Sequence, residues 1–340
     1  MKIKKLLLFL LIGFVLFFLI IDTKNATFAA INSLILCARN VIPTLFPFFV
    51  ISGLLVNTGI VAILAKILSP VSNILFKTSG NGAVVFLMGI ICGYPTGAKV
   101  VSELYCEGSI EKNEGERLLA FCNNSGPLFV IGAVGEMMLG NHKTGVILYI
   151  IHVISAILTG VIFGLFSKRE IINQKNEFKT YTLGEAMSKS IESAVKSILN
   201  VCGYVVFFGV LSSLTENLFI NSLLEVTNGA KKLSESGLNT EIMLILISFV
   251  IGFGGICVLL QVQSAVSSAG LSVKLYTMGK IIQAILSAVI TKIYLLTVKD
   301  IPVFSPNPIP QRVAFDMWYI VLFLFLISLI LMMHRLTKKR

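Results

Sequence analysis

Runs of apolar residues recur along the whole chain, separated by short polar or glycine-rich stretches. A helix needs about 20 mostly apolar residues to cross the hydrocarbon core of a bilayer. The runs that approach this length are Leu6–Ile21, Val41–Val56, Val146–Phe166, Val201–Leu214, Ile242–Leu260, Ile281–Leu296 and Trp318–Met333. They lack the polar–apolar alternation of barrel strands, and a helix satisfies its backbone amides internally, as lipid demands. The pattern predicts an all-α polytopic membrane protein.

Composition and charge support this prediction. The 340 residues are 56% hydrophobic and 13% charged, and mean hydropathy is +0.90, whereas soluble domains carry about 25% charged residues. The net charge of +11 comes largely from basic residues that flank apolar runs: Lys2, Lys4, Lys5, Lys168, Arg169, Lys175, Lys179, Arg335, Lys338, Lys339 and Arg340. The positive-inside rule accounts for this placement without nucleic-acid binding. It predicts two cytoplasmic termini and an even number of crossings, about 8–10.

The chain contains two related halves. A shift of 160 residues places Ala30–Leu54 on Ser190–Leu214, and a shift of 162 pairs Gly93 with Gly255 and Lys112 with Lys274. Whether the halves are inverted or parallel stays open. The predicted organisation is an N-terminal membrane helix (1–26), a first repeat (27–166), a cytoplasmic linker (167–182), a second repeat (183–298), and a loop with a C-terminal membrane helix (299–340).

Two apolar segments of the first half are too short to span the bilayer. Ala83–Cys92 ends at a Gly-Tyr-Pro-Thr-Gly sequence, and Leu128–Leu139 begins after Asn-Asn-Ser-Gly-Pro. Each is predicted to be a half-helix that turns inside the membrane, and interrupted helices in a repeat protein indicate a transporter's binding site near the midplane. The alternative is that both sequences are ordinary turns at the membrane surface.

The residues predicted to bind substrate lie at these interruptions. A helix that starts near Thr96 would direct backbone N–H groups at an anion, with Lys99 on its next turn, and the second interruption offers uncharged donors and acceptors. In the second half, glutamines follow the glycines of 252–255; those glycines could instead serve close helix packing. The full set is Gly93, Tyr94, Thr96, Gly97, Lys99, Asn123, Asn124, Ser125, Gly126, Gln261, Gln263 and Ser264.

Two ionisable residues in apolar helices need separate interpretation. Glu136 either carries a coupling proton or lies at the interface beside Asn141 and His142, and the sequence favours neither. His152 is interpreted as a core residue rather than a ligand. The six cysteines show no zinc spacing, and no catalytic motif is present. The sequence therefore predicts no enzymatic activity, no metal and no cofactor.

The interruptions also resemble a known family. The segments Gly93–Lys99, Glu116–Pro127 and Gln261–Ser264 are similar to those of the sporulation integral membrane proteins of the YlbJ type (SpoVV), which contain the Gate nucleoside-recognition domain. The resemblance covers roughly residues 31–297. It implies that each repeat is Gate-type, with a fold similar to parts of concentrative nucleoside transporters and ferrous-iron permeases. It also implies a protein of the outer forespore membrane of endospore-forming bacteria.

The function implied by this resemblance is movement of dipicolinate toward the forespore, which supports cortex formation and spore maturation. Lys99 and the amides of Asn123, Asn124, Gln261 and Gln263 suit the carboxylates and ring nitrogen of such a dianion. The expected partners are this anionic heterocycle, the lipid bilayer and other sporulation membrane proteins. Alternatives are a nucleoside-like solute carrier and a non-transporting membrane scaffold needed for the cortex.

Overall fold

The computed structural model describes residues 2–167, 180–215 and 217–297, and every regular element in these ranges is a helix. Residues 299–340, predicted to hold a C-terminal span, lie outside the described residues, as does most of the predicted linker. The elements are α1 (Lys2–Ile21), α2 (Thr23–Leu36), the π-turn η1 (Cys37–Val41), α3 (Ile42–Asn57), α4 (Ile60–Leu75), α5 (Gly80–Cys92), α6 (Thr96–Cys106), α7 (Lys112–Cys122), the π-helix η2 (Leu128–Met138), α8 (His142–Leu165), α9 (Leu183–Ser213), α10 (Leu218–Leu224), α11 (Val226–Ser234), α12 (Thr240–Phe253), α13 (Gly255–Ser267) and α14 (Lys274–Thr297).

The described residues contain enough long apolar helices to confirm a polytopic helical membrane protein. Four spans are long and apolar enough to cross: α8, α9, Thr240–Ser267 and α14. Two bent pairs raise the number to six, namely Val15–Ile21 with Thr23–Arg39, bent by 101°, and Leu45–Asn57 with Ile60–Leu75, bent by 86°. The total of 8–10 crossings stays a prediction because the Trp318–Met333 run is not among the described residues.

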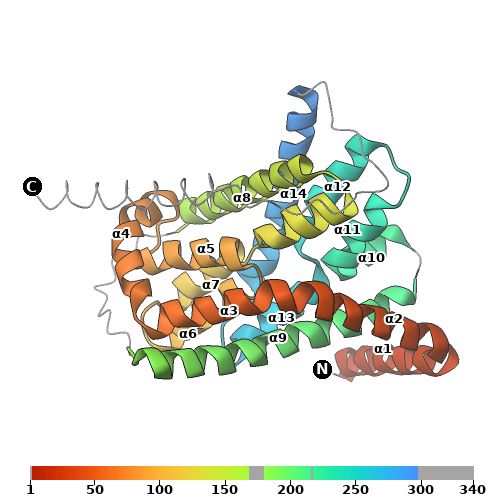
Figure 1. The fold of residues 1–340 in the computed structure, drawn as a ribbon, viewed down its shortest axis with the longest axis horizontal. Helices are drawn as coiled ribbons and strands as arrows, with labels where there is room; N and C mark the ends of the chain where they lie inside the picture. The colour runs from red at the N-terminus through yellow and green to blue at the C-terminus, as the bar shows by residue number, and fades with distance from the viewer. Residues whose placement is uncertain (1, 168–179, 216, 298–340) are drawn as a thin grey trace, which may run out of the picture.

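The run Val201–Leu214 proves to be only the second half of a longer helix. α9 begins at Leu183, where the Thr182 side chain accepts from the Glu185 amide and the Glu185 carboxylate accepts from Thr182 N–H, forming a capping box. The first half of α9 carries polar residues such as Glu192 and Lys196, so a search for apolar runs did not include it. α2 and α3 pack along α9 in Figure 1.

Three helices are interrupted at the predicted places. α5 ends at Cys92 and α6 begins at Thr96, α7 ends at Cys122 and η2 begins at Leu128, and α12 and α13 meet at Gly254. Gly93, Gly254 and Gly255 have φ values of +78°, +82° and +83°, a backbone region that glycine adopts without steric cost. The predicted run Ile242–Leu260 is divided because it contains two successive glycines of this kind. α14, which corresponds to α7 and η2 under the 162-residue shift, is continuous.

The two halves pack tightly around the C-terminal end of α7. A Cβ atom added to Gly89 or Gly97 would overlap the Cys122 carbonyl, and one added to Gly279 would overlap the Ala120 carbonyl. α5, α6 and α14 therefore approach α7 at backbone distance, the small-residue packing typical of membrane helices. This packing fixes the ends of the broken helices relative to α14.

We expect the Gly89→Ala variant to be destabilised by about 1–3 kcal/mol, because overpacking a close backbone contact displaces both helices. The measurement is thermal unfolding of the purified chain in detergent, followed by circular dichroism. Gly203→Ala on α9 is the matched control, since no heavy atom lies within 4 Å of its added Cβ. Equal melting temperatures for the two variants would contradict the close packing.

Candidate solute-binding site

The first two interruptions cross one another inside the protein. A Cβ atom on Gly93 would lie 3.1 Å from Gly126 N, so the two turns touch through backbone. The Ser125 N–H donates to His152 Nε2 at 3.0 Å, and His152 lies near the middle of α8. Asn123, Asn124 and Ser125 are almost wholly buried. The crossing therefore lies about halfway along a membrane-spanning helix.

The start of α6 differs in one respect from the sequence prediction. The helix begins at Thr96 as predicted, but the Ala98 N–H donates to Asn123 Oδ1 at 3.3 Å. Gly97 packs on the Cys122 carbonyl, so the N-terminal end of α6 meets the C-terminal end of α7. The opposite partial charges of these two ends attract each other. The α6 terminus thus positions the Asn123 loop, a role that the sequence did not predict. Its predicted role in binding an anion stays a prediction.

A lysine that the sequence analysis did not identify lies at this crossing. Lys280 of α14 is 3% exposed, and its Nζ donates to Gln283 Oε1 at 2.8 Å and to Asn124 Oδ1 at 3.4 Å. Gln283 Nε2 donates to the same Asn124 oxygen at 2.9 Å. No carboxylate among the described residues lies within ion-pair distance of Lys280. A protonated lysine has three donors, so one N–H of Lys280 is without a partner in this part of the chain.

Unpaired polar atoms gather around the same place. Among the described residues, the buried side-chain atoms without a hydrogen-bond partner here are Tyr94 OH, Thr96 Oγ1, Asn123 Nδ2, Ser125 Oγ, His152 Nδ1 and Tyr276 OH. Most buried polar groups in native proteins are paired, and each exception needs an explanation. A solute that brings its own acceptors and donors would satisfy several of these atoms. His152 is a core residue as predicted, yet only one of its two ring nitrogens has a partner.

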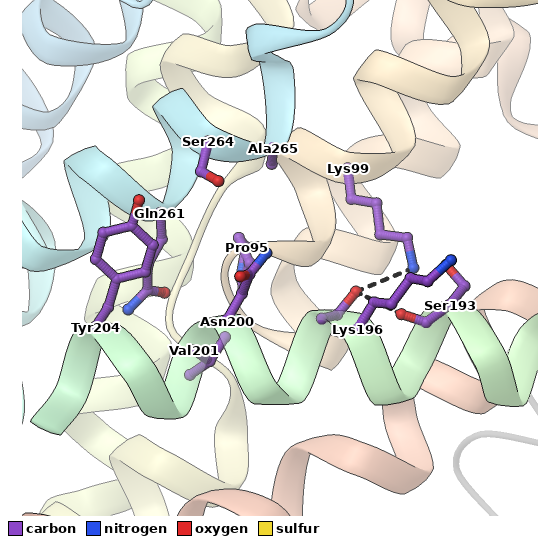
Figure 2. A pocket seen from close by; sticks show the side chains of 11 residues that line it. Pro95, Lys99, Ser193, Lys196, Asn200, Val201, Tyr204, Gln261, Ser264 and Ala265 are labelled. Atoms are coloured by element: carbon purple, nitrogen blue, oxygen red, sulfur yellow. Dashed lines mark hydrogen bonds between the residues drawn. The ribbon is translucent and has the colours of Figure 1, made fainter.

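Three of the remaining predicted site residues lie at a second place, a pocket that Pro95 also lines. Figure 2 shows Lys99, Gln261 and Ser264 around a cavity of about 180 Å³ that α9 closes from below. Lys99 Nζ donates to Ser197 Oγ of α9 at 3.2 Å. The predicted set is thus divided in two, with the Asn123–Gly126 loop at the buried crossing and Lys99, Gln261 and Ser264 at the pocket. Gln263 is exposed and lines neither place.

Glu136 lies at the end of η2, away from both places. Its carboxylate contacts His142 Nδ1, and both side chains are partly exposed, 29% for Glu136 and 45% for His142. Asn141 next to it caps α8 by accepting from the Thr144 amide at 3.0 Å. The structure thus places Glu136 beside His142 and near Asn141, and both alternatives that the sequence left open for Glu136, proton coupling and an interfacial position, stay predictions.

The signal that could have identified Lys280 was present in the sequence. Lys280 immediately precedes the apolar run Ile281–Leu296, and Gln283 lies inside it. Ionisable and amide side chains within a span indicate a functional site, but Lys280 stood at the edge of the run and resembled a flanking charge. Only the packing of α14 against α7 and α8 shows that it is buried at the crossing.

Comparisons with known proteins agree with this architecture. Residues 38–168 match the Gate family model, described as nucleoside recognition. The chain is 27% identical over 338 residues to the sporulation integral membrane protein YlbJ of Bacillus subtilis, covering 85% of this chain and 83% of that one. No solved structure matches. The chain is therefore a polytopic helical membrane protein, similar to the Gate family over residues 38–168 and to the sporulation membrane protein YlbJ over most of its length.

Proposed function

We propose that this protein is a sporulation transporter that moves dipicolinate across the outer forespore membrane. The observation that carries the proposal is Lys280, a buried lysine without a carboxylate partner in the described residues, placed where two half-helices meet. A buried charge is costly unless it is paired. An anionic solute would supply the missing counter-charge, so binding the solute removes a cost that the empty site carries.

The surrounding groups suit a planar heterocyclic dianion. Dipicolinate has two carboxylates on either side of a pyridine nitrogen, all of them acceptors. Lys280 Nζ, Asn123 Nδ2 and the hydroxyls of Tyr94, Ser125 and Tyr276 are donors with unused capacity. Charge-assisted hydrogen bonds are roughly twice as strong as neutral ones. The site has the chemistry of an anion carrier, and we propose no catalytic step in it.

The test is uptake of labelled dipicolinate by the purified full-length chain in liposomes, with and without an imposed proton or sodium gradient. We expect Asn124→Ala to lower uptake about tenfold or more, because Lys280 and Gln283 lose their shared acceptor. Lys99→Ala is measured alongside it. Unchanged uptake in both variants would refute the proposed site. Absence of uptake by the unmodified chain under every gradient would favour a membrane scaffold that transports nothing.

A second candidate function follows from the family description. The Gate domain is described by nucleoside recognition, and the amides of Asn124 and Gln283 could bind a nucleobase edge as well as a carboxylate. Competition of labelled dipicolinate uptake by unlabelled nucleosides and by pyridine monocarboxylates separates the two. Inhibition by nucleosides at lower concentration than by dipicolinate itself would favour the nucleoside carrier.

A further inference from the structure

The pocket in Figure 2 is separate from the Lys280 site. It lies between α6, α9 and α13, and its lining includes Pro95, Lys99, Ser197, Tyr204 and Gln261. None of the residues that surround Lys280, namely Asn124, Tyr276 and Gln283, lines it. The sequence analysis did not identify the α9 residues of the lining as site residues. They lie in the polar first half of that helix and in its middle, before or at the start of the apolar run that was recognised.

Two observations indicate that this pocket binds a ligand. Gln261 is 5% exposed, lines the cavity, and its Oε1 has no partner among the described residues, while its Nε2 contacts only Cys257 Sγ at 3.4 Å. Lys99 extends along the pocket to Ser197, a neutral partner. A buried amide oxygen and a lysine without a contacting carboxylate at one cavity provide an acceptor and a cationic donor for a bound solute.

The other charges near the pocket do not cancel Lys99 by direct contact. Lys196 lines the pocket, but its Nζ is 2.7 Å from Glu192 Oε1 on the exposed side of α9. Glu103 follows Lys99 by one turn of α6 and attracts it electrostatically without an ion-pair contact. Lys99 is therefore the cation of the pocket that remains available to an anion.

We propose that this pocket is an outer binding site for the same small aromatic carboxylate, occupied before the solute reaches Lys280. The proposal rests on the proposed function. Lys99 would bind a carboxylate at one end, and the Tyr204 ring, beside Gln261 in Figure 2, offers a face for a flat heterocycle at the other. A cavity of about 180 Å³ is large enough for one such ring.

The Tyr94–Pro95 turn separates the two sites. Pro95 lines the pocket, whereas the buried Tyr94 hydroxyl lies beside Ser125 of the inner loop. Gly93, which precedes both, touches Gly126 of the inner loop. One short turn thus contacts the outer pocket on one face and the inner loop on the other.

The experiment measures protection of an introduced thiol in the purified full-length chain in detergent. Cys106, which is exposed, and Cys202, which is partly exposed, are first replaced by serine. Ser264→Cys places a thiol in the pocket, and Gln263→Cys places one on the adjacent exposed position outside it. We expect dipicolinate to slow modification of the Ser264→Cys variant by a cationic methanethiosulfonate several-fold, and to leave the Gln263→Cys variant unchanged.

Combining Ser264→Cys with a second substitution separates the two sites. With Lys280→Gln, we expect protection to persist although uptake is lost, which supports two distinct sites. With Lys99→Gln, half-maximal protection shifts to about tenfold or more higher dipicolinate, the loss expected for one charge-assisted contact. The matched control is Lys189→Gln, an exposed lysine of α9 outside the pocket.

The failures of the two proposals are distinguishable. The outer site is overturned if Lys280→Gln abolishes protection of the Ser264→Cys thiol. It is also overturned if dipicolinate gives no protection of this thiol while the unmodified chain transports dipicolinate normally. Both results leave the transporter proposal standing. Absence of uptake by the unmodified chain, with protection still observed and sensitive to Lys99→Gln, overturns transport and keeps the binding pocket.

Discussion

Replacement of Lys280 by glutamine is expected to abolish dipicolinate uptake while leaving the protein as stable as before, or more stable. Glutamine keeps a polar side chain that reaches Asn124 and Gln283, but it removes the charge. Each hydrogen bond to a charged group contributes about 1.5–3 kcal/mol, and a dianion loses its cationic partner altogether. We therefore expect uptake at a fixed low concentration to fall by about 100-fold or more.

Stability distinguishes a binding role for Lys280 from a structural one. A lone buried charge destabilises the protein that contains it, and replacement by a neutral side chain is often neutral or stabilising. We expect the melting temperature of Lys280→Gln in detergent to be unchanged or raised, and added dipicolinate to raise it less than in the unmodified chain. Lys292→Gln is the control on the same helix, where the lysine is exposed. A strongly lowered melting temperature, with uptake reduced only in proportion to folded protein, would show that Lys280 is structural.

The helices and their interruptions were predictable from sequence because each has a local cause. Apolar runs of the right length gave the spans α8 and α14, and Gly93 and Pro127 marked the ends of broken helices. Gly93 and Gly255, paired by the internal repeat, both stand at helix breaks in the structure. These features are set by residues that are close in the sequence. The helix breaks agree with the two-repeat organisation, which stays a prediction.

The part of the site that sequence missed depends on contacts between distant segments. Asn124 and Gln283 are 159 residues apart and Lys99 and Ser197 are 98 apart. No spacing rule relates such positions, because the interruption in one half is completed by a continuous helix of the other. The separation of Lys99 from the Asn124 loop was hidden for the same reason: only the packing of α9 shows that Lys99 donates to Ser197 of that helix.

Asn124→Asp is expected to inactivate transport by supplying from within the protein the anion that the site lacks. Asn124 Oδ1 lies 3.4 Å from Lys280 Nζ, so a carboxylate of the same shape forms an ion pair with Lys280. This intramolecular partner competes with the solute at all times and needs no association step, which gives it a large effective concentration. Uptake should fall about 100-fold or more, because the solute loses its charge-assisted contact with Lys280 and is repelled by the new carboxylate at position 124.

Stability should change much less than function. Pairing the buried lysine removes part of its desolvation cost, but aspartate loses the hydrogen bond that Asn124 Nδ2 donates to the Phe121 carbonyl at 2.7 Å. We therefore expect Asn124→Asp to melt at about the same temperature as the unmodified chain, and dipicolinate to give no further increase. Asn217→Asp is the matched control, since Asn217 is an exposed N-cap whose oxygen accepts from the Phe219 and Ile220 amides and aspartate caps equally well. Combining Asn124→Asp with Lys280→Gln leaves an unpaired buried carboxylate and should destabilise the protein strongly. Normal uptake by Asn124→Asp would mean that the solute never meets Lys280, and the inner site would have to be placed elsewhere.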